Sequence, residues 1–532
     1  MTSTILAELL ESAAAEENAG RWNEALRTFD RAYRLAVRGG ELPALVETVV
    51  RLGHAQRRAG DFKGATEHFE LAILLSANMD GEVLAGRALN GLGLMAQAKG
   101  LMEEAEQYYH DALTRAGRAE DWALAGDVEQ NLGIVANIRG DLDEAERRYT
   151  RGLELAERTS NRNSVVSALN NLGMLHVDRG RLDHAEVFFD KAAGVSLEIG
   201  NVLMQGAVEI NRAELHLARD EPERARESCD QAFEIFSRLG NTHGQAEAFK
   251  FYGIIYRQGE KLHLAAMHLE RAIELAASSN PLIEAESQRE LALVFRAQGR
   301  NREALTALNR SHALFTRLRA ETDQTDIRRR IARLEGDFLS LVQMWGESIE
   351  AKDRYTGGHC ERVADYACRL GAELGIAPND MVWFRMGAFL HDLGKTEVPE
   401  EVLNKPGRLT DEERSVMERH PAAGEEMLAS VEFPWDIRPM VRSHHERWDG
   451  HGYPDGLVGE AIPFSARILR VADVFDALTT TRSYRHPLTP EAALALMEQD
   501  EGSFDGEIFA AFRRLFPELR VIAERAGAVG CD

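Results

Sequence analysis

Two pairs of adjacent metal-ligand side chains stand close together in the C-terminal third of the chain. The segment HDLGK places His391 beside Asp392, and the segment HHERWDGHGYPDG places His444 beside His445. Further residues of the same kinds lie around these pairs: His359, His420 and Asp473. Imidazole and carboxylate ligands without thiolates suit iron, manganese or a similar divalent ion. The set predicts a metal-dependent phosphohydrolase site, with enough ligands for two ions that share a carboxylate.

Buried histidines have an alternative explanation, because a single histidine beside apolar residues is more often a hydrogen-bonded core residue than a ligand. Seven such groups in one stretch favour a metal site, since so many buried imidazoles and carboxylates cannot all find neutral partners cheaply. His359 shares a helical face with Val363, and His420 is predicted to continue a helix that begins at a capping box of Thr410 and Glu413. We therefore expect the ligands to lie on helices, in a buried site.

The chemistry of such a site follows from the charge of a phosphodiester. The anion repels hydroxide, so hydrolysis at neutral pH needs positive charge on the phosphoryl oxygens and a deprotonated nucleophile, which two metal ions supply. Lys395, one turn after His391, is a candidate for stabilising charge on a non-bridging oxygen. The expected ligands around a bridging Asp392 are His391 and Asp473 for one ion and His420, His444 and His445 for the other.

Three segments together resemble the HD-GYP family of HD-domain phosphohydrolases: HDLGK, HHExxDGxGYP and ARILRVADVFDALTTTRSYR. The resemblance covers about residues 340 to 515. It implies a bacterial signalling enzyme that cleaves the 3'-5' phosphodiester of cyclic di-GMP to pGpG, GMP or both, with two divalent ions, iron or manganese. Tyr355 stands where some members carry a glutamate that is associated with a third metal, which favours two ions.

The same resemblance implies roles for individual residues. The implied catalytic residues are Asp392 and Lys395. The implied metal ligands are His359, His391, Asp392, His420, His444, His445 and Asp473. The implied substrate contacts are Asp353, Tyr453, Arg482 and Arg485. Two alternatives stay open, namely a weakly active or inactive adaptor that senses a nucleotide, and a hydrolase of another cyclic dinucleotide or of pGpG. The complete ligand set with Lys395 argues against the adaptor, whereas no residue excludes another substrate.

The N-terminal part of the chain, up to position 315, carries a repeat at a constant pitch. Glycines stand at positions 20, 60, 100, 140 and 180, and an alanine follows each of them five positions later. Four positions beyond the alanine comes a large side chain such as Tyr109 or Phe189, and the preceding helix ends in a Leu-Gly pair such as Leu92-Gly93. Small and large residues alternating on one helical face predict packed helix pairs.

These features resemble tetratricopeptide repeats, in about eight units over residues 1 to 315. The resemblance implies a helical solenoid whose concave groove binds a peptide or a partner protein. Residues 316 to 350 contain no proline and are predicted to form a helical connector to a domain at residues 351 to 532. A heptad-like seam runs along the connector: Ile327, Ile331, Leu334, Phe338, Leu341 and Trp345. It favours a homodimer through a coiled coil, and the alternative is packing on the chain's own helices.

Composition limits the class of protein. Lys and Arg number 63 against 87 Asp and Glu, which gives a net charge of −24 and argues against polymeric DNA or RNA as a partner. The four cysteines form no CxxC motif, so a reducing compartment fits. No apolar run of about 18 residues occurs, and the acidic N-terminal stretch does not resemble a signal peptide. We expect an all-α, multidomain, cytoplasmic protein without membrane insertion.

Overall fold

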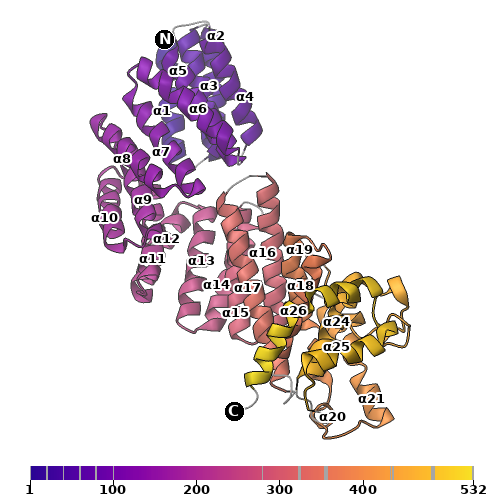
Figure 1. The fold of residues 1–532 in the computed structure, drawn as a ribbon. Coiled ribbons are helices and arrows are strands. Elements are labelled where there is room, and N and C mark those ends of the chain that lie inside the picture. Colours follow the sequence, from indigo (N-terminus) through magenta and orange to yellow (C-terminus); the bar gives the residue numbers. More distant parts are fainter. Residues whose placement is uncertain are drawn as a thin grey trace. The chain divides into compact units, whose positions relative to one another are not determined.

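Every element that the structure describes is a helix (Figure 1), which confirms the predicted all-α fold. The structure is a computed structural model. It describes residues 2–18, 22–39, 41–58, 61–77, 81–99, 101–277, 280–321, 325–352, 358–429, 431, 433, 436–480 and 486–529. The chain divides into two compact units, Met1–Val294 with Leu314–Ile331 and Phe295–Ala313 with Ala332–Asp532. None of the described helices combines the length and the apolar character that a membrane span requires.

The first fourteen described helices of the N-terminal array form consecutive pairs that repeat at regular intervals, in agreement with the pitch of the glycines and alanines, and a fifteenth helix follows them. They are α1 (Thr2–Asn18), α2 (Trp22–Gly39), α3 (Leu42–Arg58), α4 (Phe62–Ser76), α5 (Glu82–Ala98), α6 (Met102–Arg118), α7 (Trp122–Arg139), α8 (Leu142–Arg158), α9 (Arg162–Asp178), α10 (Leu182–Glu198), α11 (Val202–Ala218), α12 (Pro222–Arg238), α13 (Thr242–Gln258), α14 (Leu262–Ala276) and α15 (Pro281–Ala297). Several starts are fixed by an Asp or Asn side chain that accepts an N–H of the first turn: Asp121, Asp141, Asn161, Asn201 and Asn241.

The Leu-Gly pairs let an aromatic ring lie close to the backbone of the first helix in each pair. A Cβ atom added at Gly93 would lie 2.4 Å from the ring of Tyr109, and one added at Gly173 would lie 2.5 Å from the ring of Phe189. Both rings are fully buried. Gly140 has a φ of 82° and so ends α7 in the left-handed conformation that glycine adopts readily. The glycines at positions 20, 60 and 100 lie outside the described residues.

Two longer helices follow the array, α16 (Asn301–Glu321) and α17 (Thr325–Glu350). The chain passes between the two compact units more than once in this region: Phe295–Ala313 belongs to the second unit and Leu314–Ile331 to the first. The predicted domain limits at residues 315 and 350 stay a prediction.

The heptad-like seam of α17 is buried within a single chain. Leu334, Phe338 and Leu341 are at most 1% exposed. The Phe338 ring lies 5.0 Å from the ring of Trp383 and 6.4 Å from that of His312. Ile331 and Trp345 are also buried, and the side chain of Ile327 lies outside the described residues. Burial favours packing on the chain's own helices, so a homodimer stays a prediction without a surface assigned to it.

Within the described residues, the second unit continues with α-helices of 4 to 24 residues and three short 3-10 helices, labelled η. They are α18 (His359–Glu373), α19 (Pro378–Leu390), η1 (Leu393–Glu397), α20 (Glu400–Leu403), α21 (Asp411–Met417), α22 (His420–Leu428), α23 (Arg438–Ser443), η2 (Gly459–Ala461), α24 (Phe464–Thr479), α25 (Pro490–Gln499), η3 (Glu501–Ser503) and α26 (Gly506–Val529). The η1 segment packs directly on α22, because a Cβ atom added at Gly394 would lie 1.9 Å from the carbonyl oxygen of His420. Glycine is therefore needed at this position of the HDLGK segment.

Candidate metal centre

The predicted ligands, which we expected to lie on helices, stand mostly at helix ends. His359 and His420 are the first residues of α18 and α22, whereas the His391-Asp392 pair follows the end of α19. The His444-His445 pair follows α23, and only Asp473 lies inside a helix, α24. The capping box of Thr410 and Glu413 is present, but its helix, α21, ends at Met417 before His420. That part of the expectation is wrong, because Pro421 cannot continue a helix from α21.

Helix ends supply free carbonyl groups that orient the imidazoles. The last carbonyls of a helix have no partner in the helix. The Nδ1 atoms of His391, His420 and His444 lie 2.6 to 2.7 Å from the carbonyl oxygens three residues before them, those of Ala388, Met417 and Val441. With Nδ1–H donating to a carbonyl, each ring turns its Nε2 atom toward the centre of the site. The helix ends therefore explain where these ligands stand.

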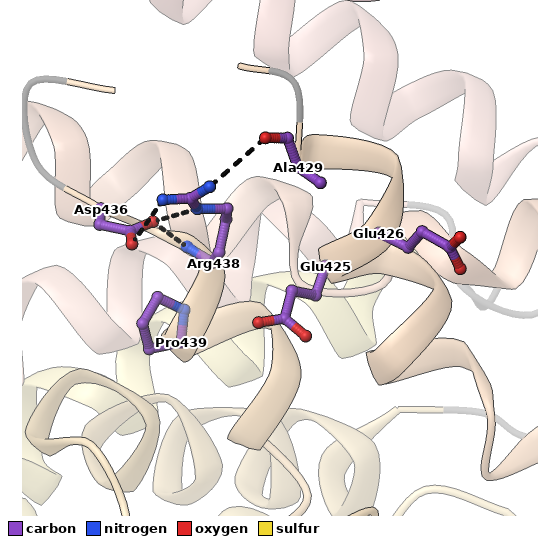
Figure 2. A pocket seen from close by; sticks show the side chains of 6 residues that line it. All are labelled: Glu425, Glu426, Ala429, Asp436, Arg438 and Pro439. Atoms are coloured by element: carbon purple, nitrogen blue, oxygen red, sulfur yellow. Dashed lines mark hydrogen bonds and ion pairs between the residues drawn. The ribbon is translucent and has the colours of Figure 1, made fainter. Parts of the chain in front are cut away.

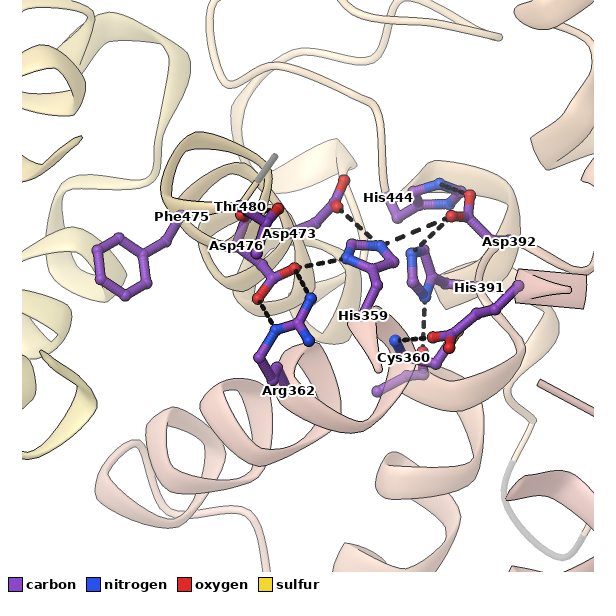
Figure 3. Close-up of polar contacts among 12 residues, drawn as sticks. His359, Cys360, Arg362, His391, Asp392, His444, Asp473, Phe475, Asp476 and Thr480 are labelled. Carbon is purple, nitrogen blue, oxygen red and sulfur yellow. Dashed lines mark hydrogen bonds and ion pairs between the residues drawn. The ribbon is translucent and has the colours of Figure 1, made fainter. Parts of the chain in front are cut away.

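The two oxygens of Asp392 face two different groups of histidines. Its Oδ2 atom lies 3.3 Å from Nε2 of His391 and 3.7 Å from Nε2 of His359. Its Oδ1 atom lies 3.3 Å from Nε2 of His420 and 3.9 Å from Nε2 of His444. Figure 3 shows His359, His391, Asp392 and His444 converging on one point. One carboxylate thus stands between two sets of nitrogen donors.

The ligand atoms form two groups that share Asp392. One group contains His359, His391 and Asp392, and the other contains Asp392, His420, His444 and His445; within each group all ligand atoms lie within 4.8 Å of one another. The second group is the expected one. In the first group His359 takes the place expected for Asp473, whose Oδ1 atom lies 3.5 Å from Nε2 of His359. All seven predicted ligands are therefore near neighbours.

The pKa shifts of Asp392, His444 and His445 favour the forms that bind a cation, whereas the pKa of His391 is raised because Asp392 outweighs the effect of burial. Burial alone would raise the pKa of Asp392, but the Lys395 ammonium, 2.6 Å from its Oδ2 atom, and the His391 imidazole lower that pKa well below its ordinary value. Burial and the neighbouring imidazoles lower the pKa of His444 to about 3 and that of His445 well below its ordinary value. An ionised carboxylate and neutral imidazoles are the forms that bind metals.

The donor set fits divalent metal ions. Nε2 of His359, Nε2 of His391 and Oδ1 of Asp392 are buried and have no hydrogen-bond partner among the described residues. Buried polar atoms without partners are costly and rare, and a bound cation would satisfy all three. The nearby Cys360 stays a neutral thiol, because burial and Glu350 raise its pKa well above the ordinary value. The donors are thus imidazoles and carboxylates, a set that suits iron or manganese.

The loop that carries the GYP segment is held against the site by a buried carboxylate. Glu446, 1% exposed, accepts the N–H groups of Asp455, Gly456 and Leu457 at 2.7 to 3.1 Å. At Gly452 a Cβ atom would lie 2.3 Å from the backbone nitrogen of Arg447, so the loop folds back closely on itself. The ring of Tyr453 consequently lies 4.7 Å from that of His445. The predicted substrate contact Tyr453 is therefore beside the ligands.

Three predicted substrate contacts cannot be placed. Asp353, Arg482 and Arg485 lie outside the described residues, as does Tyr355. A separate pocket of about 280 Å³ is lined by Glu425, Glu426, Ala429, Asp436, Arg438 and Pro439 (Figure 2). The guanidinium group of Arg438 already donates to Asp436 and to the carbonyl of Ala429. No predicted ligand lines this pocket, and we assign no function to it.

Two protein families match parts of the chain. The HD domain family matches residues 343–508, the part that contains all seven candidate ligands. The C-terminal part of the chain thus resembles an HD domain. The tetratricopeptide repeat family matches residues 84–158, 127–198 and 205–278, within the helical array that precedes the HD domain. Both matches agree with the described helices.

Relatives of the HD domain are bacterial phosphodiesterases. The cyclic di-GMP phosphodiesterase response regulator RpfG of Xanthomonas campestris pv. campestris is 40% identical over 216 residues, 40% of this chain and 55% of the relative. The 3'3'-cGAMP-specific phosphodiesterase 3 of Vibrio cholerae is 39% identical over 175 residues, 33% of this chain and 38% of the relative. The cyclic di-GMP phosphodiesterase of Thermotoga maritima is 35% identical over 193 residues, 36% of this chain and 52% of the relative. This chain thus spans about half the length of these relatives or less, and the resemblance to HD-GYP proteins with tetratricopeptide repeats is confirmed.

Asp476, which the sequence did not single out, holds the ring of the candidate ligand His359. This carboxylate is fully buried, and its Oδ2 atom lies 2.8 Å from Nδ1 of His359, while Arg362 donates to both of its oxygens at 2.7 and 3.1 Å (Figure 3). Burial alone would raise the pKa of Asp476, but His359 and Arg362 lower it. An ionised carboxylate behind a ligating imidazole fixes its tautomer and its direction. Its spacing could have indicated this position, since Asp476 follows Asp473 by three residues and residues three apart are neighbours on a helix.

We expect Asp476→Asn to weaken Mn²⁺ binding by about 10- to 100-fold, the range for outer partners of metal-ligating histidines. The amide keeps the shape of the side chain but removes the charge that holds His359. A titration of the metal-free protein with Mn²⁺ measures the change. Asp505→Asn is the matched control, because Asp505 is buried and pairs with Arg467 at 2.5 Å without contacting a ligand. Equal Mn²⁺ affinity in both variants would contradict the orienting role.

Proposed function

We propose that the chain is a metal-dependent phosphodiesterase that hydrolyses cyclic di-GMP to pGpG, GMP or both. The observation that carries the proposal is the position of Asp392, whose two oxygens face two separate groups of histidines at 3.3 to 3.9 Å. The names of the relatives support the same reaction class. We propose two divalent ions, with Fe or Mn as the element.

The proposed ligands are His359, His391, Asp392, His420, His444, His445 and Asp473. When bound, the ions would neutralise the phosphoryl oxygens and lower the pKa of a nucleophilic water. Asp392 would hold both ions through its two oxygens, and the neutral imidazoles would donate their Nε2 lone pairs. Lys395, fixed beside Asp392, would place a positive charge near a non-bridging oxygen of the substrate. Asp476 would keep His359 in the tautomer that leaves Nε2 free.

We propose that substrate binds on the GYP side of the site. Tyr453 is anchored there by the loop that Glu446 holds, and its ring is near His445. An aromatic ring at this position suits contact with a nucleobase, since every base offers a flat face for stacking. Asp353, Arg482 and Arg485 remain proposed substrate contacts, the two arginines for phosphate or a guanine edge.

The test is a product assay on the full chain loaded with Mn²⁺ or, without oxygen, Fe²⁺. Cyclic di-GMP, 3'3'-cGAMP and pGpG are incubated separately, and the products are resolved by chromatography. We expect cyclic di-GMP to be converted to pGpG or GMP, and protein treated with a chelator to form neither. Absence of any product from cyclic di-GMP with both metals would overturn the proposal.

A second candidate substrate is 3'3'-cGAMP, because one of the relatives at 39% identity is specific for it by name. The same assay decides between the two by the ratio of their kcat/KM values. The adaptor alternative, in which the domain only senses a nucleotide, predicts binding without product from any of the three. The buried atoms without partners at the ligand positions argue against that alternative, because an adaptor has no need for them.

We also propose that the tetratricopeptide repeats regulate the HD domain after binding a peptide or partner protein. Helix α17 supports this proposal, since it runs without a break from Thr325 to Glu350. At its start Arg330 pairs with Glu286 of α15, and Glu286 also binds Lys250 of α13 at 2.7 Å. A partner that moved these repeats would thus act on α17. If α17 has two states, the partner could shift the equilibrium between them only by the difference between its binding free energies for those states.

A further inference from the structure

The last turn of α17 is hydrogen-bonded to the first turn of α18. Glu350, the final residue of α17, accepts the backbone N–H of Gly358 at 2.7 Å through Oε2 and that of Cys360 at 2.5 Å through Oε1. Between these two donors stands His359, the candidate ligand that begins α18. One carboxylate from another helix therefore holds the backbone on both sides of a ligand.

The start of α18 needs such an acceptor. The first N–H groups of a helix have no partner in the helix, and a neighbouring side chain at the N-cap position usually accepts one of them. Gly358 occupies that position here, with a φ of 71° and no side chain to offer. Glu350 supplies two oxygens in its place, and its negative charge is favourable at the positive end of the helix dipole. The cap of α18 thus comes from α17.

Other contacts tie the end of α17 to the segments that carry further ligands. A Cβ atom added at Gly346 would lie 3.4 Å from the carbonyl oxygen of Phe389, which precedes His391 by two residues. The ammonium of Lys352 donates to the carbonyl of Thr396, in the η1 segment that follows Asp392, at 3.3 Å. A displacement of this end of α17 would therefore shift the segments that carry His359, His391 and Asp392.

We infer that Glu350 is a positioning residue of the metal centre, acting through the start of α18 to fix His359. The inference deepens the proposed function, on which it rests, because it names the contact through which α17 would reach that site. By the usual rise of 1.5 Å per residue, α17 is about 39 Å long. The ion pair of Arg330 at its start and the cap by Glu350 at its end thus belong to one helix.

The inference predicts a change in metal affinity. Glu350→Ala removes both acceptors and leaves the N–H groups of Gly358 and Cys360 without the carboxylate, so the start of α18 and His359 are no longer held. We expect Mn²⁺ affinity to fall by about tenfold or more, the lower bound for loss of an outer partner of a ligand. Glu350→Gln keeps one acceptor oxygen and should show a smaller loss. A purely structural cap would lower the melting temperature and leave Mn²⁺ affinity unchanged.

The experiment uses the full chain without nucleotide. Metal-free protein is titrated with Mn²⁺, free Mn²⁺ is followed by electron paramagnetic resonance, and the melting temperature of each metal-free variant is recorded. Glu347→Ala is the matched control, because Glu347 is exposed on the same helix and its side chain accepts from Gln343 of that helix at 3.1 Å. The expected order of Mn²⁺ affinity is wild type and Glu347→Ala, then Glu350→Gln, then Glu350→Ala.

Wild-type Mn²⁺ affinity in Glu350→Ala would overturn the inference. If that variant does not fold, Glu350→Gln decides, and wild-type affinity in Glu350→Gln would equally overturn it. The outcome is separable from that of the proposed function, since Mn²⁺ binding is measured without cyclic di-GMP. A protein that binds Mn²⁺ in the expected order but cleaves no nucleotide would refute the proposed reaction and leave the role of Glu350 standing.

Discussion

Asp392→Asn is expected to abolish hydrolysis and to reduce bound metal to one ion per chain or fewer. The reason is that the two oxygens of Asp392 face different histidines. Oδ2 lies 3.3 Å from Nε2 of His391, and Oδ1 lies 3.3 Å from Nε2 of His420. An asparagine keeps one carbonyl oxygen, replaces the other by an amide group that cannot ligate, and removes the negative charge. Two cations without a shared carboxylate repel one another across a short distance. Elemental analysis of the purified variant and chromatography of its products measure both effects.

The matched control is Asp380→Asn, an exposed aspartate on α19, the helix that leads into the HD pair. It should retain wild-type metal content and turnover. A cooperative melting transition of metal-free Asp392→Asn would show that the variant is folded. We expect its melting temperature to be lower than that of the wild type, since the change removes the buried carboxylate that lies 2.6 Å from the Lys395 ammonium. If Asp392→Asn binds two ions and turns over normally, the bridging role is refuted.

The seven candidate ligands could be selected from the sequence because their residue types and local spacing are those of a metal site. His391 next to Asp392 and His444 next to His445 are pairs that packing alone does not require, and long motifs surround them. The array was predictable for a related reason, since a constant pitch repeats the same packing contact, such as Gly93 against Tyr109. Both are properties of short stretches, which a sequence displays directly.

The supporting residues were not predictable in the same way. Asp476 reaches His359 across 117 positions of sequence, and Glu350 reaches the start of α18 across a segment that has no obvious motif. Their roles depend on which helices meet, and a periodic pattern does not specify that. The seam on α17 makes the same point, because a heptad-like period marks an apolar stripe without saying whether a second chain or the same chain covers it.

The error at His420 has a local cause. The capping box of Thr410 and Glu413 suggested one helix through His420, whereas α21 ends at Met417 and Pro421 lies in the first turn of a new helix. The break matters for function, because it leaves the carbonyl of Met417 free to accept Nδ1–H of His420 at 2.7 Å. A site assembled from helix ends gains such orienting carbonyls, which a site within continuous helices would lack.

Lys395→Met is expected to lower kcat by about 10²- to 10³-fold with little change in metal content, the scale seen when one preorganised charge-stabilising group is lost. Methionine keeps an unbranched apolar side chain, one atom shorter, but lacks the ammonium that lies 2.6 Å from Asp392 Oδ2. Because a nearby cation favours the charged form of a carboxyl group, bound metal should keep Asp392 ionised without the ammonium. Steady-state kinetics with cyclic di-GMP and elemental analysis give the two readouts.

The control is Lys405→Met, which breaks an ion pair of the same domain, since Lys405 binds Glu413 at 2.6 Å without contacting a ligand. It should keep wild-type kcat. Two results for Lys395→Met would each contradict a transition-state role. A raised KM at unchanged kcat would mean that Lys395 contributes equally to ground-state and transition-state binding. Loss of the metal together with turnover would mean that Lys395 acts by keeping Asp392 charged, and its ammonium would then serve the ions and not the phosphoryl oxygens.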